Sequence, residues 1–239
     1  MNCVTPALVI LSATCLTTSA EMVSLCDTTP RAITSGSPAV IVFDAALPAG
    51  ATVDAVTIDL DLDHDWLGDL RVHLGHDSAG AVLMDRPNLG LYPFGCGGRD
   101  LVATFDDDAV TTPDDLCVAT TPDPQPEPML TGLLRPDQPL GAFAGLEAGG
   151  GWTLTITDFG ALDDGTLHEV CLHITYTLPP PLCPDTTGDG NVNFDDLNVI
   201  LAQWGTAGPD GDVAPPGGNG VVDFDDLNAV LTSWGQSCP

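Results

Sequence analysis

The sequence contains no lysine, and five arginines stand against 34 acidic residues. The formal net charge is therefore −29 over 239 residues. Nucleic acids and anionic membrane surfaces attract proteins through basic patches. The scarcity of basic side chains excludes binding to these partners through the protein's own charge.

Long apolar runs are scarce as well. The clearest one, residues 7–16, is shorter than the roughly 20 residues that a membrane-spanning helix needs. Small residues follow it up to Ala20, which is typical of a secretory signal peptide over residues 1–20, and a buried apolar strand is the alternative. The sequence therefore predicts a secreted, extracellular protein without a membrane span.

The high net charge does not imply that the chain is disordered. Hydrophobic residues account for 44% of it, more than a charge-dominated disordered chain carries. Among the acidic residues, 30 are aspartate and four are glutamate. Aspartate favours turns over helices, and its carboxylate is a ligand for Ca2+. This composition favours a β-rich protein that binds cations.

Zinc-binding patterns such as CxxC are missing, so disulfides are the expected use of cysteine. Six cysteines remain after residue 20, and six cysteines can pair in about 15 ways. Position along the chain favours one pair, Cys183–Cys238, which brackets the C-terminal segment. A second pair, Cys96–Cys117, would close one long loop and leave Cys26–Cys171 by elimination, and the sequence alone leaves the connectivity of these four open.

A proline-rich stretch, residues 179–184, is the expected linker between residues 21–178 and 185–239. Residues 21–178 alternate apolar and polar side chains with a period of two, and Gly, Pro and Asp clusters separate these runs. The clearest runs are Val56–Leu62, Leu70–Leu74, Trp152–Ile156 and Val170–Tyr176. This pattern predicts a mainly β protein with an antiparallel β-sandwich, and residues 106–139 are expected to form a surface excursion.

Several ordered motifs in this part resemble the P/Homo B domain. They are His64-Asp-Trp-Leu-Gly-Asp-Leu-Arg-Val-His-Leu74, Pro139-Leu-Gly-x-Phe143, Gly151-Trp-Thr-Leu-Thr-Ile-Thr-Asp158 and Asp164-Gly-x-Leu167. That module follows the subtilisin-like catalytic domain of proprotein convertases. The resemblance implies a P-domain-like jelly-roll sandwich and carries over no catalytic residue. Apart from the resemblance, the acidic residues of this part of the chain suggest a structural calcium ion near Asp63, Asp65, Asp69 or Asp158.

Residues 185–239 contain an internal repeat with a constant offset of 30 residues, as from Gly190 to Gly220. Each copy carries apolar residues at helical spacing, after an aspartate-rich loop. The two stripes are Leu197/Ile200/Leu201/Trp204 and Leu227/Val230/Leu231/Trp234. Two short helices cannot bury such stripes alone, so we expect them to pack against each other. The prediction is a small α module of two EF-hand-like loop-helix repeats.

The first loop fits the EF-hand pattern of calcium ligands, in which alternate residues converge on one ion and a glycine permits the sharp turn. The expected ligands are Asp185, Thr187, Asp189, the backbone carbonyl of Asn191, Asn193 and Asp196.

The second loop is wider, because Asp212 stands three residues further upstream than the repeat predicts. A widened loop can still close with Asp212 as its first ligand. The expected ligands are Asp212, Asn219, the backbone carbonyl of Val221, Asp223 and Asp226. The alternative for both loops is a helix N-cap without an ion. Nine aspartates and no basic residue follow position 184, which argues for a counter-ion.

The duplicated loop and helix, residues 185–236, resemble a type I dockerin. The resemblance implies two bound Ca2+ ions and a protein partner, either cohesin-like or another extracellular protein. Just before each last ligand, where dockerins often have hydroxyl residues, this chain has Phe194–Asp195 and Phe224–Asp225.

Together these features predict a secreted, non-catalytic calcium-binding protein. Its sandwich would act as a binding or stabilising module, and its dockerin-like tail would attach it to a partner protein. The alternative is an extracellular hydrolase, peptidase-associated or carbohydrate-active, with a site in the sandwich that no sequence motif marks. Gly75-His-Asp-Ser-Ala-Gly80 is close to a nucleophile motif, but its spacing fits a hairpin turn better.

Overall fold

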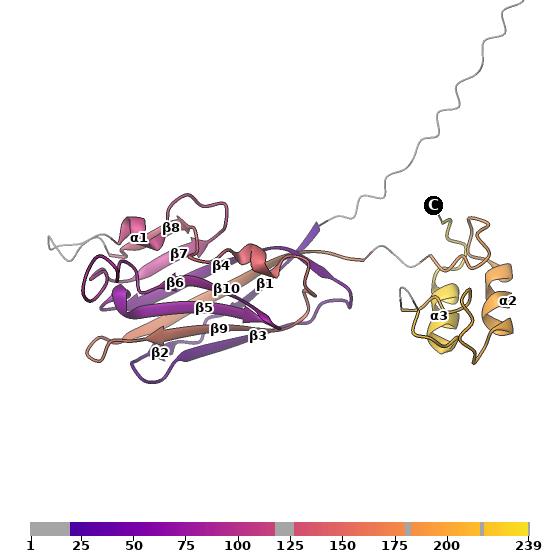
Figure 1. Ribbon diagram of the computed structural model, residues 1–239, viewed down its shortest axis with the longest axis horizontal. Coiled ribbons are helices and arrows are strands. Elements are labelled where there is room, and N and C mark those ends of the chain that lie inside the picture. The colour runs from indigo at the N-terminus through magenta and orange to yellow at the C-terminus, as the bar shows by residue number, and fades with distance from the viewer. Residues whose placement is uncertain (1–19, 118–126, 180–182, 216–217, 239) are drawn as a thin grey trace, which may run out of the picture. The chain divides into compact units, whose positions relative to one another are not determined.

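The computed structural model describes residues 20–117, 127–179, 183–215 and 218–238. Contacts divide the chain into two compact units between residues 179 and 180, and each unit is described by itself (Figure 1). The predicted signal peptide lies outside the described residues except for Ala20, and so do residues 180–182 of the predicted linker.

The N-terminal unit is built from two β-sheets (Figure 1). The larger sheet has the order β1 (Ala20–Asp27), β10 (Gly165–Thr177), β4 (Thr52–His64), β7 (Leu101–Phe105) and β8 (Leu130–Leu134), and β2 (Arg31–Ile33) also pairs with β10. The smaller sheet has the order β3 (Ala39–Ala45), β9 (Gly150–Asp158), β5 (Leu70–His76) and β6 (Ala79–Asp85). Two short 3-10 helices cover Leu67–Asp69 and Leu140–Phe143.

The alternation in the sequence corresponds to one buried and one more exposed face of each long strand. In β4, the apolar residues of Val56–Leu62 are buried, and the intervening residues are partly exposed. The predicted strands at Leu70–Leu74, Trp152–Ile156 and Val170–Tyr176 show the same pattern. Buried residues of both sheets form a single core. The prediction of a mainly β protein is confirmed, and the two sheets with one core are consistent with a β-sandwich.

Residues 106–139 differ from the expected surface excursion. They include helix α1 (Pro113–Leu116), which begins with a capping box between Thr112 and Asp115. They also include β8, which pairs parallel to β7 and buries Leu130 and Leu134. The sequence did not predict β8, because the strand has only five residues and Gly132 interrupts its alternation. Aspartate- and proline-rich turns also surround it. The described parts of this segment therefore contribute to the sheet and to the core.

All three expected disulfides are present: Cys26–Cys171, Cys96–Cys117 and Cys183–Cys238. The first joins directly opposite residues of β1 and β10. The second ties the segment after β6 to the end of α1. These bonds fit an oxidising compartment, since structural disulfides persist outside the cytosol.

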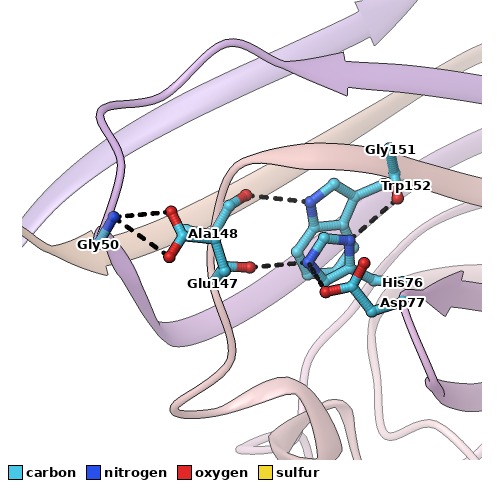
Figure 2. A network of polar contacts seen from close by, with 7 residues as sticks. All are labelled: Gly50, His76, Asp77, Glu147, Ala148, Gly151 and Trp152. Atoms are coloured by element: carbon cyan, nitrogen blue, oxygen red, sulfur yellow. Dashed lines mark hydrogen bonds and ion pairs between the residues drawn. The ribbon is translucent and has the colours of Figure 1, made fainter. Parts of the chain in front are cut away.

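A stacked pair of rings fills one region of the core, as Figure 2 shows. His76 ends β5 and lies opposite Trp152 of β9, with ring centroids 3.9 Å apart and planes inclined by 4°. The two ring nitrogens of His76 lie 3.0 Å and 2.7 Å from the carbonyl oxygens of Gly151 and Glu147. The indole Nε1 of Trp152 donates to the carbonyl of Ala148. The loop before β9 is thereby held against the core.

The C-terminal unit contains helices α2 (Phe194–Ala202) and α3 (Phe224–Thr232). Four fully buried side chains form its core: Val192, Ile200, Val222 and Val230. Cys183 and Cys238 pack against this core, so the disulfide closes the unit. Within the described ranges, neither these helices nor α1 has the length and apolar character needed to cross a membrane.

Candidate functional site

The first aspartate-rich loop winds around the carboxylate of Asp185. One oxygen of Asp185 accepts a hydrogen bond of 2.8 Å from the backbone N–H of Gly188, and the other accepts one of 2.7 Å from Gly190. Gly190 has a φ of 85°, which favours glycine because it has no Cβ. This sharp turn brings the later part of the loop back towards Asp185.

At the far end of the loop, Asp196 is fully buried. It accepts hydrogen bonds of 3.0 Å from the backbone N–H and the hydroxyl of Thr187, and the same hydroxyl lies 3.2 Å from Asp185 Oδ1. Burial raises the pKa of the Asp196 carboxyl, but hydrogen bonds from Asn193 and Thr187 outweigh this effect, so its pKa lies below the ordinary value. Oxygens from three expected ligands therefore meet around Thr187.

The remaining expected ligands of this loop lie on its other side. The side-chain N–H of Asn193 donates to Asp189 Oδ2 at 3.0 Å and to the backbone carbonyl of Asn191 at 3.2 Å. The Asn193 amide thus links two expected ligand oxygens, Asp189 Oδ2 and the carbonyl oxygen of Asn191. A cation at this position would contact both oxygens directly. The loop offers carboxylate, hydroxyl, amide and carbonyl oxygens, which is the donor set that Ca2+ prefers. These residues fit a calcium ion.

The wider second loop repeats these contacts around Asp212. Its two carboxylate oxygens accept hydrogen bonds of 2.8 Å from the backbone N–H groups of Asn219 and Gly220, so Asp212 occupies the place of Asp185. Asn219 in turn accepts from the N–H of Val221 at 2.9 Å, as Asp189 does from Asn191. Residues 216–217, within the insertion, lie outside the described residues. The insertion therefore leaves the geometry at Asp212 intact.

Asp226 closes the second loop as Asp196 closes the first. It is fully buried and accepts hydrogen bonds of 2.7 Å and 2.8 Å from the backbone N–H groups of Val213 and Ala214. A third, from the N–H of Asp223, completes a capping box at the start of α3. Asn193 and Asp196 form the same box at α2. These reciprocal caps explain why both helices begin at these positions.

The sequence did not predict how the repeats pair. Val192 of the first loop exchanges backbone hydrogen bonds of 2.9 Å with Gly235 and Gln236, which follow α3. Val222 of the second loop does the same with Gly205 and Thr206 after α2, at 2.8 Å. The sequence does carry a signal for this pairing, since both polar loops have an apolar residue, Val192 or Val222, at the same repeat position. Each loop is thus held by the other repeat.

The expected apolar stripes are only partly buried, which corrects the sequence-based expectation. Ile200 and Val230 are fully buried, and Leu197 and Leu227 pack at the edge of the core. Both helices end two residues before the tryptophans, so the helical spacing does not extend to them. The exposed members of the stripes are Leu201 at 55%, Trp204 at 40%, Leu231 at 50% and Trp234 at 49%.

The sandwich presents a polar ladder on the outer face of its larger sheet. Ser24 Oγ lies 2.7 Å from His173 Nδ1, and His173 Nε2 lies 3.0 Å from Asp59 Oδ2. His168 Nε2 and Asp63 form a second exposed pair at 3.0 Å. Asp59 borders a shallow groove of about 420 Å³ between β4, β7, β8 and β10. Asp59 and Asp63 of β4 are therefore each paired with a histidine of the neighbouring strand β10.

Three metal-ligating side chains come within 4.8 Å of one another at one place in the described residues: Cys26, Glu169 and Cys171. Both cysteines belong to a disulfide, which leaves no thiolate for a metal.

No known family model matches the chain, and no curated protein matches it. Among solved structures, the serine protease of Aeromonas sobria is similar over 66% of this chain and 27% of the protease, at 19% identity and a TM-score of 0.43. The same protease in complex with its chaperone ORF2 gives 67% and 28%, at 16% identity and a TM-score of 0.42. The third, FLHE, covers 66% of this chain and 96% of its own, at 13% identity and a TM-score of 0.35. The chain thus spans less than a third of either protease structure.

Proposed function

We propose that this chain is a secreted, non-catalytic calcium-binding protein whose C-terminal repeats bind two Ca2+ ions and attach it to a partner protein. The observation that carries the proposal is the equivalence of the two loops. Asp185 and Asp212 accept the same backbone hydrogen bonds, although the second loop is wider. A helix N-cap needs only Asn193 or Asp223 with its capping box. The remaining carboxylates have no role in capping, and a bound ion would account for their convergence in both loops.

Electrostatics supports the same proposal. The unit has nine aspartates and no Arg, Lys or His after residue 184. Hydrogen bonds stabilise the buried carboxylate of Asp196, but the mutual repulsion of the nine aspartates still opposes folding. Two Ca2+ ions would neutralise up to four of these charges. In this proposal the aspartates provide ligands, and ion binding is coupled to folding.

Attachment to a partner is supported by exposed apolar side chains on this unit. Phe194 and Phe224, the first residues of α2 and α3, are 61% and 73% exposed. Trp204 contacts Phe224 edge-to-face at 5.2 Å and stays partly exposed. Aromatic residues are enriched in the buried parts of protein interfaces. The partner would be cohesin-like or another extracellular protein, and the jelly-roll sandwich would be the binding or stabilising module that is attached.

Calcium titration of the full chain tests this proposal. We expect two equivalents for the unmodified protein and one equivalent after Asp196→Asn or Asp226→Asn, measured by calorimetry. The matched controls are Asp195→Asn and Asp225→Asn, which remove neighbouring exposed charges that we do not assign to ligands. These controls should keep both equivalents. Equal losses from ligand and control variants, or no calcium binding at all, would contradict the proposal.

A hydrolase is the second candidate, and one observation favours it. Ser24, His173 and Asp59 form a chain of contacts in which the serine could pass its proton to the imidazole during attack on a carbonyl carbon. The three side chains lie on a sheet face where β10 pairs with β1 on one side and with β4 on the other. Those ladders use the N–H groups that an oxyanion would need.

For this reason we expect no turnover of activated esters, such as p-nitrophenyl acetate, above the buffer rate. Spectrophotometric assays of the full chain and of Ser24→Ala should give the same rate. A rate that Ser24→Ala abolishes and Ser37→Ala leaves unchanged would establish the hydrolase instead.

A further inference from the structure

A buried pair of polar groups lies between the two sheets of the sandwich, at the ends of two strands. His64 ends β4 in the larger sheet, and Asp158 ends β9 in the smaller one. Both side chains are fully buried, and His64 Nε2 lies 3.8 Å from Asp158 Oδ2. Neither of these two atoms has a hydrogen-bond partner. Buried polar atoms are rarely left unpartnered, because each costs about 1–3 kcal/mol.

The contacts of the other ring nitrogen, Nδ1, indicate which tautomer of His64 could bind a cation through Nε2. Nδ1 lies 3.0 Å from the carbonyl oxygen of Trp66, to which it donates when it is protonated. When Nδ1 is unprotonated, it accepts a hydrogen bond of 3.1 Å from the backbone N–H of Trp66. When Nδ1 carries the proton, it donates to this carbonyl, and the lone pair of Nε2 faces the carboxylate of Asp158. In this tautomer the two lone pairs repel unless a metal cation lies between them, whereas in the other tautomer the proton on Nε2 lies between the ring and the carboxylate. Metal-binding histidines are commonly oriented by such a hydrogen bond from the other ring nitrogen to a carbonyl.

A third donor, Asp69, lies next to this pair. The backbone N–H of Phe159 donates to the carbonyl of Asp69 at 2.9 Å, so Asp69 is fixed beside the end of β9. A Cβ on Gly160 would collide with Asp69 Oδ2 and would lie 3.3 Å from Asp158 Oδ1, so the two carboxylates flank this glycine. Burial raises the pKa of the Asp69 carboxyl, the charge of Asp158 raises it further, and Arg86 offsets part of this effect.

A path from solvent leads to Asp69. It lines an open pocket of about 360 Å³ together with Trp66, Arg86, Phe94 and Phe159. Neither His64 nor Asp158 lines this pocket. Solvent therefore reaches Asp69 through this pocket but does not reach the buried pair.

We propose that His64 Nε2, Asp158 and Asp69 bind a divalent transition-metal ion, for which Zn2+ is the probe. One imidazole nitrogen with two carboxylates is a donor set for Zn2+, whereas Ca2+ takes oxygen ligands. Donors at about 2.0–2.2 Å from one zinc ion are about 3.4 Å apart in a tetrahedron and at most about 4.3 Å apart. The observed 3.8 Å between His64 Nε2 and Asp158 Oδ2 lies within this range. The ligand atoms of His64, Asp158 and Asp69 do not all lie within 4.8 Å of one another, so the Asp69 side chain has to rotate towards the pair to complete the site.

The test uses the full chain with Ca2+ in excess, so that the C-terminal loops do not take up zinc. Calorimetry should show one equivalent of Zn2+ bound. Asp158→Asn keeps the shape of the side chain and an acceptor for the N–H of Gly160. It should weaken binding by more than the about 10- to 100-fold that loss of an outer-shell partner costs. The matched control is Asp63→Asn, which breaks the exposed His168–Asp63 pair on the same strand and should leave zinc affinity unchanged.

A second measurement needs no variant and therefore does not depend on how Asp158→Asn folds. Of the five histidines, His64 alone should show a large shift of its Nε2 resonance in 15N spectra when Zn2+ is added. No zinc equivalent, a shift at His168 or His173 in place of His64, or equal weakening by Asp63→Asn would overturn the proposal. Absence of zinc binding would leave His64 and Asp158 as a buried structural pair. This result would not bear on calcium binding by the repeats.

Discussion

Chelation of Ca2+ is expected to unfold the C-terminal unit while the sandwich remains folded. Ions present at about 1,000 times their dissociation constant stabilise a protein by about 4 kcal/mol per site. Among its described residues, the unit has four fully buried hydrophobic side chains, Val192, Ile200, Val222 and Val230. Such a small core is marginal on its own, particularly beside nine aspartates. Loss of two ions should therefore exceed the stability that the rest of the unit provides.

Hydrogen exchange of the full chain, read by mass spectrometry, distinguishes the two units. In chelator, peptides from α2 and α3 should lose protection, and peptides from β4 and β10 should keep it. Restoring Ca2+ should restore the protection, because the Cys183–Cys238 disulfide survives chelation. Unchanged protection of α2 and α3 in chelator would show that these loops are capped helices that need no ion.

Replacement of Trp152 by alanine is expected to lower the stability of the sandwich by about 3–5 kcal/mol, the usual cost of removing a large buried aromatic side chain. Trp152 is fully buried, stacks on His76 and packs against Phe143 with ring centroids 5.0 Å apart. Its removal also frees the carbonyl of Ala148, which accepts from the indole (Figure 2). The cavity would lie where the loop before β9 meets the core.

Urea unfolding followed by near-ultraviolet circular dichroism measures this effect. Trp234→Ala is the matched control, because Trp234 is 49% exposed and lies in the other unit. It should leave the transition of the sandwich within about 0.5 kcal/mol of the unmodified protein, as surface substitutions usually do. A loss of less than about 1 kcal/mol for Trp152→Ala would show that the His76 stack does not hold this region together.

The main strands and the loop geometry were predictable because each depends on local sequence. A period of two reports which face of a strand is buried, and it located β4, β5, β9 and β10 correctly. The place of Asp212 was also predictable from the repeat, since a wider loop still has to return to the same turn at Gly220. Cysteine positions favoured Cys183–Cys238, because this pair brackets one segment, whereas the other two pairs depend on how β1, β10 and α1 are placed by the fold.

The errors arose where tertiary contacts outweigh local pattern. Trp204 fits a helical stripe, yet α2 ends at Ala202 and leaves this tryptophan beside Phe224. β8 was missed because its partner β7 lies far along the chain and runs parallel to it. The sequence also contains a signal for the buried pair of polar groups. The alternation in β4 and in β9, extended by two residues, reaches His64 and Asp158, which places these polar side chains on the buried face.

The Cys183–Cys238 bond also has a mechanical consequence. Cys183 is the point where the chain enters the C-terminal unit, and the Cα atom of Cys238 is only 5.8 Å away. The N–H of Cys238 donates to the carbonyl of Gly190 inside the first aspartate-rich loop. A pulling force that enters the unit at Cys183 therefore divides between two covalent paths, the backbone that continues to Asp185 and the disulfide to Cys238. The unit cannot be extended from this end without loading both paths.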